Sequence, residues 1–378
     1  MLIVPLEDAR PGMKLAAPVY HPERPDQELL RAQFVLDEPI IRRMRAIGIE
    51  VVFVDYPSLE SLDKHLAPYL SPARQKVLKN IRLAMAATQQ ATRPAISYQE
   101  YCTNTQDLID TLLTQGQNPI YLDQMSRHGQ DAVQHAAAVA HLSLLLGLKL
   151  EQYLVDQRNR LPSHRAKDCV NLGVAGMLHD IGMTRLPTEC QRYSEADPPR
   201  DPGLRAQWET HCELAHDMLK NDLPPTAVGA VFQHHQHFDG SGFPPLRIGN
   251  LDGGQIHVFA RILLAANLYD RLARPASGGP RRSNLEIFQS LRTRYNSWVD
   301  PVVLTVLEQL APVFPPGQRV RLTDGSSAIV IEGNPHAPVR PIVQRLGPDN
   351  WTAAGPRLDL SQPGMPGIDA PGVESLAA

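Results

Sequence analysis

The sequence predicts a mainly α protein with a small α+β unit at its start and a short β segment near its end. Apolar residues recur at helical spacing through the middle of the chain, most clearly over 131–148 and 255–272. Short apolar runs at 2–6, 51–54 and 319–331 predict strands instead. The 378 residues are enough for two or three domains with a sizeable core.

Composition and charge exclude several classes of function. A net charge of -3 and a pI near 6.5 give no basic signature for nucleic acid or for a membrane surface. The four cysteines show no C-x-x-C spacing, which indicates reduced thiols in a cytoplasmic protein. The longest apolar stretch, 136–146, is interrupted by His141 and Ser143 and is too short to span a bilayer. We therefore expect a cytoplasmic protein with no nucleic-acid partner and no membrane insertion.

Residues 1–56 predict a small α+β regulatory domain. Strands are expected at both ends of this segment, and Pro11-Gly12 marks a turn. Between them, residues 38–47 have helical spacing of apolar positions, and Gly48 ends the helix. No candidate catalytic group lies in this segment, so a regulatory or assembly role is expected.

The rest of the chain divides into four further parts. A helical linker is expected over 57–126, with a helix over 71–92, and a nearly all-helical domain over 127–312. A β appendage is expected over 313–346, and the Pro/Gly-rich tail over 347–378 is expected to be disordered.

Two adjacent histidines, His234 and His235, are the centre of the candidate site. They end an apolar run and are followed by a sharp turn at 239–242. Consecutive side chains on a helix diverge by about 100°, so the two imidazoles cannot both pack into one core. They could hold different metal ions, because neutral imidazole is the commonest metal ligand. An isolated pair of this kind would be interpreted as surface histidines, but further candidate ligands lie upstream, namely His135, His179, Asp180 and His211.

The upstream residues have positions that favour metal binding. Asp131 lies one helical turn before His135, which puts both on one helix face, although an aspartate at a helix N-terminus is also expected without a metal. Asp180 follows a very apolar helix, where a buried carboxylate is costly unless it is paired or coordinating. His211 is expected on the exposed side of a helix over 204–219, and His237 is expected to be exposed.

Four sequence segments together resemble the HD-GYP family, a branch of the HD phosphohydrolases that hydrolyses cyclic di-GMP. They read P-L-E-D-A-R-P-G-M-K-L at 5–15, H-D-I-G at 179–182, H-H-x-x-x-D-G-x-G-F-P at 234–244 and A-R-I-L-L-A-A-N-L-Y-D at 260–270. The resemblance covers nearly all of residues 1–345 and implies a helical HD-type bundle over 127–312. The opening segment resembles a domain that is often fused to this family.

The resemblance also implies a set of site residues. Asp180 matches a bridging carboxylate, and with His179 it is the expected catalytic pair. The expected metal ligands are His135, His179, Asp180, His211, His234, His235, Asn267 and Asp131, where Asp131 would hold a third ion. The expected substrate-binding residues are Arg185, Arg274, Phe243, Gly242 and Asp239. Two or three divalent ions are implied, and iron or manganese suits a mixed imidazole and carboxylate shell.

The sequence departs from the family pattern at four positions, Met183, Gln236, Phe243 and Asn267. Asn267 stands where an aspartate ligand is expected, and Met183 stands where a lysine is expected. Three functions therefore stay open. The first is a bacterial phosphodiesterase that converts cyclic di-GMP to linear pGpG or GMP through a metal-activated water. The second is an HD-GYP-like metal- or nucleotide-binding signalling module with a protein partner. The third is a phosphohydrolase for another nucleotide. A homodimer is compatible with each of them.

Overall fold

A computed structural model of the chain describes its fold in ten segments. These are residues 2–21, 27–49, 51–55, 72–90, 96–115, 132–245, 251–275, 282–334, 336–348 and 352–370. The contacts divide the chain into two compact units. We call Ser71–Gln117 with His128–Ala311 the helical unit. The remainder, Met1–Leu70, Asn118–Arg127 and Pro312–Ala378, is the terminal unit.

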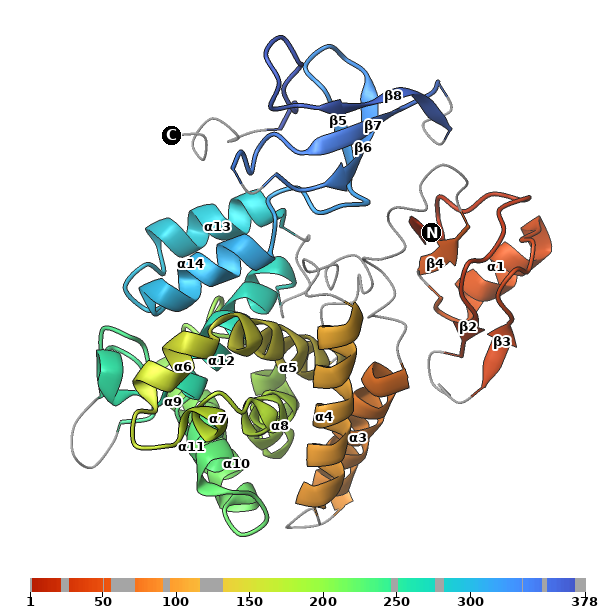
Figure 1. Cartoon of the computed structure of the whole chain (residues 1–378). Helices are drawn as coiled ribbons and strands as arrows, with labels where there is room; N and C mark the ends of the chain where they lie inside the picture. The colour runs from red at the N-terminus through yellow and green to blue at the C-terminus, as the bar shows by residue number, and fades with distance from the viewer. Residues whose placement is uncertain are drawn as a thin grey trace. The chain divides into compact units, whose positions relative to one another are not determined.

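The terminal unit combines the N-terminal α+β segment with a C-terminal sheet (Figure 1). Its helix begins where the sequence predicts, because the Asp37 side chain accepts a hydrogen bond from the Ile40 amide at 2.8 Å. Buried Val4 and Met44 share one apolar core with Ile329 of the C-terminal sheet. The elements of its N-terminal part are β1 (Leu2–Pro5), β2 (Val19–Tyr20), β3 (Glu28–Leu30), α1 (Glu38–Ala46) and β4 (Val51–Val54).

The C-terminal sheet has four antiparallel strands in sequence order. They are β5 (Arg319–Arg321), β6 (Ser327–Glu332), β7 (Ile342–Leu346) and β8 (Ala353–Asp359). β8 lies inside the segment for which the sequence predicts a disordered tail. It pairs with β7 from Ile342 opposite Asp359 to Leu346 opposite Ala353, and its Pro356 is tolerated because β8 is an edge strand. The prediction of a disordered tail is therefore wrong for this strand.

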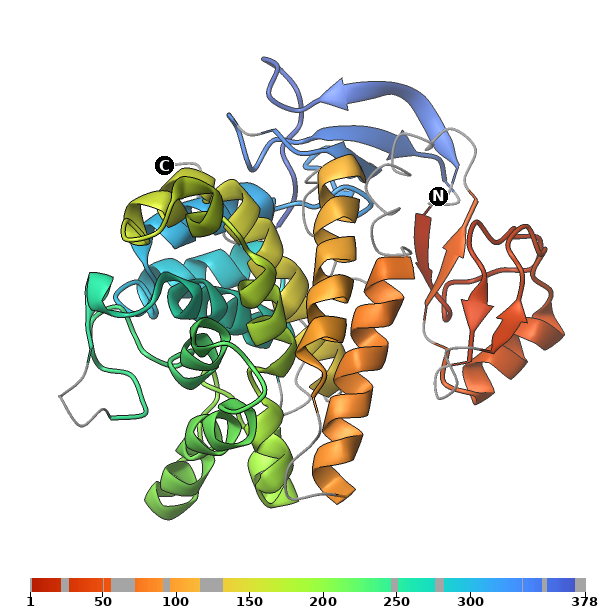
Figure 2. The same cartoon turned by 60° about the horizontal axis from the view of Figure 1, so that its bottom comes forward.

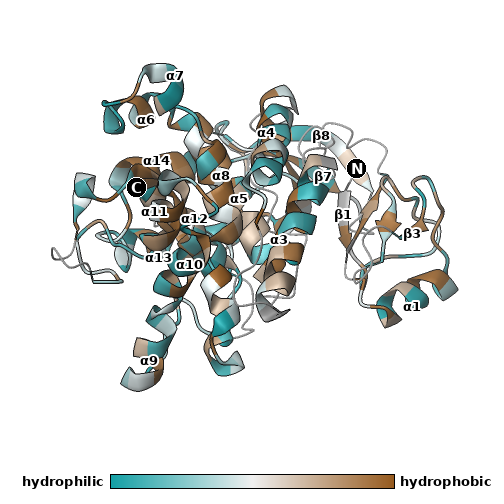
Figure 3. Cartoon of the chain, turned by 90° about the horizontal axis from the view of Figure 1, so that it is seen from below, coloured by the Kyte–Doolittle hydropathy of each residue, from teal (hydrophilic) through white to brown (hydrophobic). Residues whose placement is uncertain are grey.

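The helical unit is built around α5 (Ala132–Lys149), α8 (Val170–Leu178) and α12 (Val258–Ala273). Every residue of α5 from His135 to Gly147 is buried. Close packing depends on Gly176 of α8, because a Cβ there would lie 2.6 Å from the Cα of Ala140. Figure 3 shows brown, hydrophobic residues along α5 and α12, whereas the peripheral α7 and α9 carry teal, hydrophilic residues.

The other helices surround these three. They are α3 (Pro72–Gln90), α4 (Tyr98–Gln115), α6 (Glu151–Gln157), α7 (Ser163–Ala166), α9 (Pro202–Glu209), α10 (His211–Leu219), α11 (Pro225–Phe232), α13 (Asn284–Thr293) and α14 (Pro301–Leu310). The mainly helical fold class is confirmed. One helix was expected over 204–219, but the structure ends α9 at Glu209 and begins α10 at His211.

Helices α3 and α4 lie side by side and belong to the helical unit rather than to a linker (Figures 1 and 2). Their apolar faces explain the difference, because Ile81 of α3 and Leu108 of α4 are fully buried. Periodicity alone predicts a helix but does not say which surface covers its apolar face. Ser71, the first residue of the helix expected over 71–92, lies outside the described residues.

Among the described helices, no single one has the length and apolarity of a membrane span. The pair α5 and α6 meets the criterion only when the two are taken together, across a bend of 83°.

Candidate metal centre

The candidate ligands are delivered by the ends of three helices and by one buried turn of α5. His179 ends α8 and Asp180 follows it, His211 begins α10, and His234-His235 follow α11. His211 was expected on an exposed face, but it is completely buried. The reason lies in Gly182, where the chain passes so close to α10 that a Cβ would meet the His211 carbonyl oxygen at 2.0 Å. This contact brings the start of α10 next to Asp180.

All five histidines of the centre have the same orientation. In each, Nδ1 faces an oxygen that can only accept a hydrogen bond, so Nδ1 carries the proton and Nε2 keeps its lone pair. The acceptors are Asp270 Oδ2 for His135 (2.6 Å), Gly176 O for His179 (2.9 Å), Trp208 O for His211 (2.7 Å), Val231 O for His234 (2.5 Å) and Glu195 Oε2 for His235 (2.7 Å). Metal-binding histidines are held in this way, with the second ring nitrogen bonded to a carbonyl or a carboxylate.

The Asp180 carboxylate lies between two pairs of Nε2 atoms. Its Oδ2 is 3.5 Å from His135 and 3.4 Å from His179. Its Oδ1 is 3.8 Å from His211 and 3.7 Å from His234. Burial raises the pKa of Asp180, but the contacts with His179, His135 and His234 outweigh that effect, so the pKa lies well below its usual value. Asp180 is therefore a carboxylate at neutral pH, with one oxygen toward each pair.

His211 and His235 are held in the neutral state, which is the state that binds a metal. Burial, with the neighbouring His235, lowers the pKa of His211 to about 3, and burial also lowers the pKa of His235. Two polar atoms in the centre are buried without a hydrogen-bond partner in the described part of the chain, Nε2 of His234 and Oδ1 of Asn267. Such atoms are costly unless a ligand satisfies them. The donor set and its orphan atoms thus fit a divalent metal ion.

The possible ligand atoms form two groups, within each of which all atoms lie within 4.8 Å of one another. One group is His135, His179 and Asp180, and the other is His211, Cys212, His234 and His235. Cys212 was not among the predicted ligands. Its Sγ lies 3.5 Å from His211 Nε2, and burial, with Asp180 nearby, raises its thiol pKa well above the usual value.

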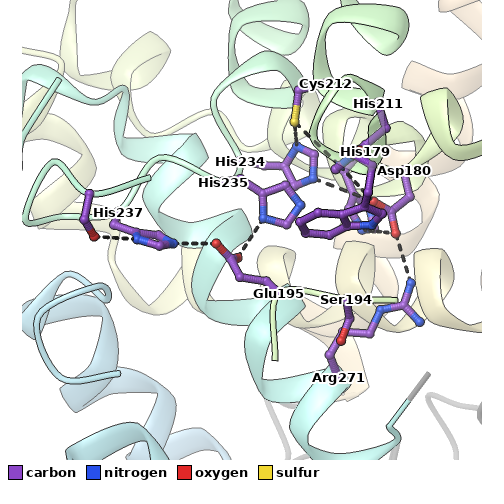
Figure 4. A network of polar contacts seen from close by, with 12 residues as sticks. His179, Asp180, Ser194, Glu195, His211, Cys212, His234, His235, His237 and Arg271 are labelled. Atoms are coloured by element: carbon purple, nitrogen blue, oxygen red, sulfur yellow. Dashed lines mark hydrogen bonds and ion pairs between the residues drawn. The ribbon is translucent and has the colours of Figure 1, made fainter. Parts of the chain in front are cut away.

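Glu195 is the most informative residue that the sequence reasoning missed. It lies between His235 and His237, and each imidazole bonds one of its carboxylate oxygens (Figure 4). The expectation that His237 is exposed is wrong. Its ring stacks on Trp298 at 3.8 Å, and the residue is 6% exposed. Glu195 lies in a loop without periodicity, so no spacing rule could have indicated it.

Comparison with known proteins places the histidines in a recognised domain. Residues 134–303 match the family described as "HD domain". The helical unit contains an HD domain. Among solved structures, the chain is similar to Bd1817, a HDG"Y"P protein from Bdellovibrio bacteriovorus, with 14% identity and a TM-score of 0.47, over 82% of this chain and 98% of that chain. A search among curated proteins found no match.

The expected substrate-binding residues have varied surroundings in the HD domain. Phe243 stacks on His235 at 4.5 Å, and Gly242 is pressed against the His235 carbonyl oxygen, which a Cβ would approach to 2.2 Å. Asp239 accepts hydrogen bonds from the amide and hydroxyl of Ser241 within its own turn. Arg274 is buried and forms an ion pair with Asp270. Arg185 follows Asp180 in the 3-10 helix Ile181–Arg185, and Asp131 lies outside the described residues.

A large basic cavity adjoins the centre. It has a volume of about 1000 Å³ and is lined by five arginines and two carboxylates. Arg271 and Ser194 line both this cavity and the smaller one at Asp180, Asn267 and His235. A cavity of this size accommodates a nucleotide-sized ligand. The arginines are Arg200, Arg205, Arg271, Arg282 and Arg294, and the carboxylates are Asp197 and Glu286.

Proposed function

We propose that the HD domain is a metal-dependent phosphodiesterase of the HD-GYP kind that hydrolyses cyclic di-GMP. The observation that carries this proposal is the common orientation of the five imidazoles, four of whose Nε2 atoms lie within 3.8 Å of the Asp180 carboxylate. In the absence of a cation, this arrangement would bury several acceptors against a negative charge. A divalent cation would bind the nitrogen lone pairs and neutralise the carboxylate.

The chain's own residues would prepare the site for hydrolysis. His211, His234, His235 and the Oδ1 side of Asp180 would hold the metal, and outward hydrogen bonds fix the three imidazoles. A bound metal lowers the pKa of a water and polarises a phosphate oxygen. The ionised Asp180 can accept the proton of an attacking water. The five arginines of the basic cavity would attract and orient the phosphodiester.

We infer iron or manganese as the metal, because the donors are mainly imidazole with one carboxylate. The thiol of Cys212 is a further donor once deprotonated, and thiolate ligation would shift the preference toward iron or zinc.

Two observations support the other candidate functions. Met183 packs against the cluster of Trp208, Cys212 and Phe243 and offers no charge to a phosphate, which favours a binding module without hydrolysis. The excess of arginines in the basic cavity favours a nucleotide with more phosphate charge than cyclic di-GMP.

The test combines metal content with turnover. The full chain is purified without oxygen, loaded with ferrous iron or manganese, and incubated with cyclic di-GMP, and products are separated by chromatography. We expect at least one metal per chain and formation of pGpG or GMP. His211→Ala should lose both, whereas His216→Ala, whose side chain is 40% exposed on the same helix, should keep both. Metal without any product would reject the phosphodiesterase and leave the binding module. A chain that takes up no metal would reject both.

A further inference from the structure

The side chain of Arg271 enters the metal centre from the last turn of α12. Its Nη2 lies 3.0 Å from Oδ2 of Asp180, and both side chains are 12% exposed (Figure 4). This oxygen is also the one that faces the Nε2 atoms of His135 and His179. A fixed positive charge therefore already occupies the His135 side of the shared carboxylate.

The second carboxylate on this side is also neutralised by an arginine. Asp270 accepts a hydrogen bond from Nδ1 of His135 and forms an ion pair with Arg274. Among the residues that the structure describes, the carboxylates next to His135 are those of Asp180 and Asp270, and each is already paired with a guanidinium.

Asn267 removes a further negative charge from the same side. It lies one helical turn before Arg271, so both face the cavity that Asp180 lines. Its amide offers only a carbonyl dipole, and its Oδ1 is buried without a partner. Compared with a carboxylate and a neutral residue at these two positions, the pair Asn267 and Arg271 makes this side more positive by two charges.

The other side of Asp180 has the opposite character. Oδ1 faces His211 and His234, and Nε2 of His234 has no hydrogen-bond partner among the described residues. His235 adds a third imidazole, which Glu195 holds in place. This side thus offers three imidazole nitrogens and a carboxylate oxygen to a cation.

We propose that Arg271 takes the place of a second metal ion, so that the centre binds one divalent metal on its His211–His234–His235 side. This inference rests on the proposed metal-dependent function. Because Arg271 also lines the basic cavity, its guanidinium can contact a substrate phosphate oxygen opposite the metal. The positive charge that a second ion would bring is then permanent and independent of metal supply.

Metal stoichiometry tests the proposal without any need for turnover. The full chain is titrated with Mn²⁺, bound metal is counted by elemental analysis, and electron paramagnetic resonance distinguishes a single Mn²⁺ from a coupled pair. We expect one Mn²⁺ in the wild type and two, with a coupled spectrum, in the double variant Asn267→Asp with Arg271→Ala. Arg292→Gln removes an exposed arginine of α13 that is paired with Glu308 of α14, and this control variant should bind one Mn²⁺.

The outcomes separate the two proposals. A wild-type chain that binds two coupled ions overturns the role of Arg271 and leaves the proposed function standing, whereas a chain that binds none overturns the proposed function itself. If the double variant does not fold by circular dichroism, Arg271→Gln keeps the bulk and removes the charge. The second ion should then bind at least about tenfold more tightly than in the wild type. A folded variant that still binds only one ion, with no weaker second site, also overturns the inference.

Discussion

Oε2 of Glu195 accepts a hydrogen bond from Nδ1 of His235 at 2.7 Å, across 40 positions of sequence. The other carboxylate oxygen bonds His237, so one buried acid orients a candidate metal ligand and is itself held by a second imidazole. Burial raises the pKa of Glu195, but His235 and His237 outweigh that effect and lower it below the usual value. Glu195 is therefore a positioning residue, ionised and fixed behind the ligand.

Replacing Glu195 by glutamine should weaken metal binding. The amide can keep one contact but removes the negative charge that makes the imidazole a better donor. We expect the affinity for Mn²⁺ to fall by about 10- to 100-fold, measured by calorimetric titration of the metal-free chain. Glu189→Gln is the matched control, because Glu189 is exposed and, among the described residues, forms its ion pair with Arg192, at 3.7 Å. Equal Mn²⁺ affinity in the two variants would contradict the positioning role.

Gly182→Ala should separate α10 from Asp180. A methyl group there would lie 2.0 Å from the His211 carbonyl oxygen, and a backbone atom cannot move aside as a side chain can. We expect a loss of about 1–3 kcal/mol in the free energy of unfolding, together with weaker metal binding.

The control for this substitution is Gly229→Ala in α11, where a Cβ meets nothing within 4 Å. It should be neutral or should stabilise the chain by up to about 1 kcal/mol, because alanine favours the helix. Urea unfolding of both variants decides the point. Similar unfolding midpoints for the two variants would show that the close approach of the chain to α10 at Gly182 is not required for stability.

The buried ion pair of Arg261 and Asp300 should be sensitive to the loss of one partner. The two atoms lie 2.6 Å apart, and Tyr153 donates a second hydrogen bond to the same Asp300 oxygen at 2.7 Å. Asp300→Asn leaves the guanidinium buried without its counter-charge, and we expect a loss of about 3–5 kcal/mol in thermal or urea unfolding.

Glu209→Gln breaks the exposed pair with Arg205 and provides the comparison for Asp300→Asn. It should cost less than about 1 kcal/mol. A loss of that small size for Asp300→Asn would mean that solvent reaches Arg261.

The sequence predicted most of the helices and six candidate metal ligands, because helical spacing and histidine motifs are local patterns. The structure brings His135, His179, Asp180, His211, His234 and His235 together. It also shows what local patterns cannot contain. Glu195 reaches His235 from a loop, and Arg271 reaches Asp180 across 91 positions. Contacts of this kind depend on the packing of distant elements, so no periodicity in the chain indicates them.

His141 should make the stability of the metal-free protein depend on pH. It lies in the buried part of α5, and burial, followed by the charge of Arg74, lowers its pKa from 6.5 to about 3. Below pH 6.5 the side chain of His141 binds a proton in the unfolded chain but not in the folded chain, so acid favours unfolding. The contribution of neutral His141 to the free energy of unfolding is therefore complete above pH 6.5 and is lost as the pH falls from 6.5 toward 3.

His141→Leu should remove this part of the pH dependence. Between pH 6 and 4, the slope of the unfolding free energy against pH should fall by about 1.4 kcal/mol per pH unit, the value for one proton. Urea unfolding in the presence of a chelator, at steps of half a pH unit, measures the slope. His164→Leu on α7 is the control, because that side chain meets water in the folded and in the unfolded chain. If the two variants have the same slope, another buried group carries the acid sensitivity, and His211, whose pKa is also lowered to about 3 by burial, is the next residue to replace.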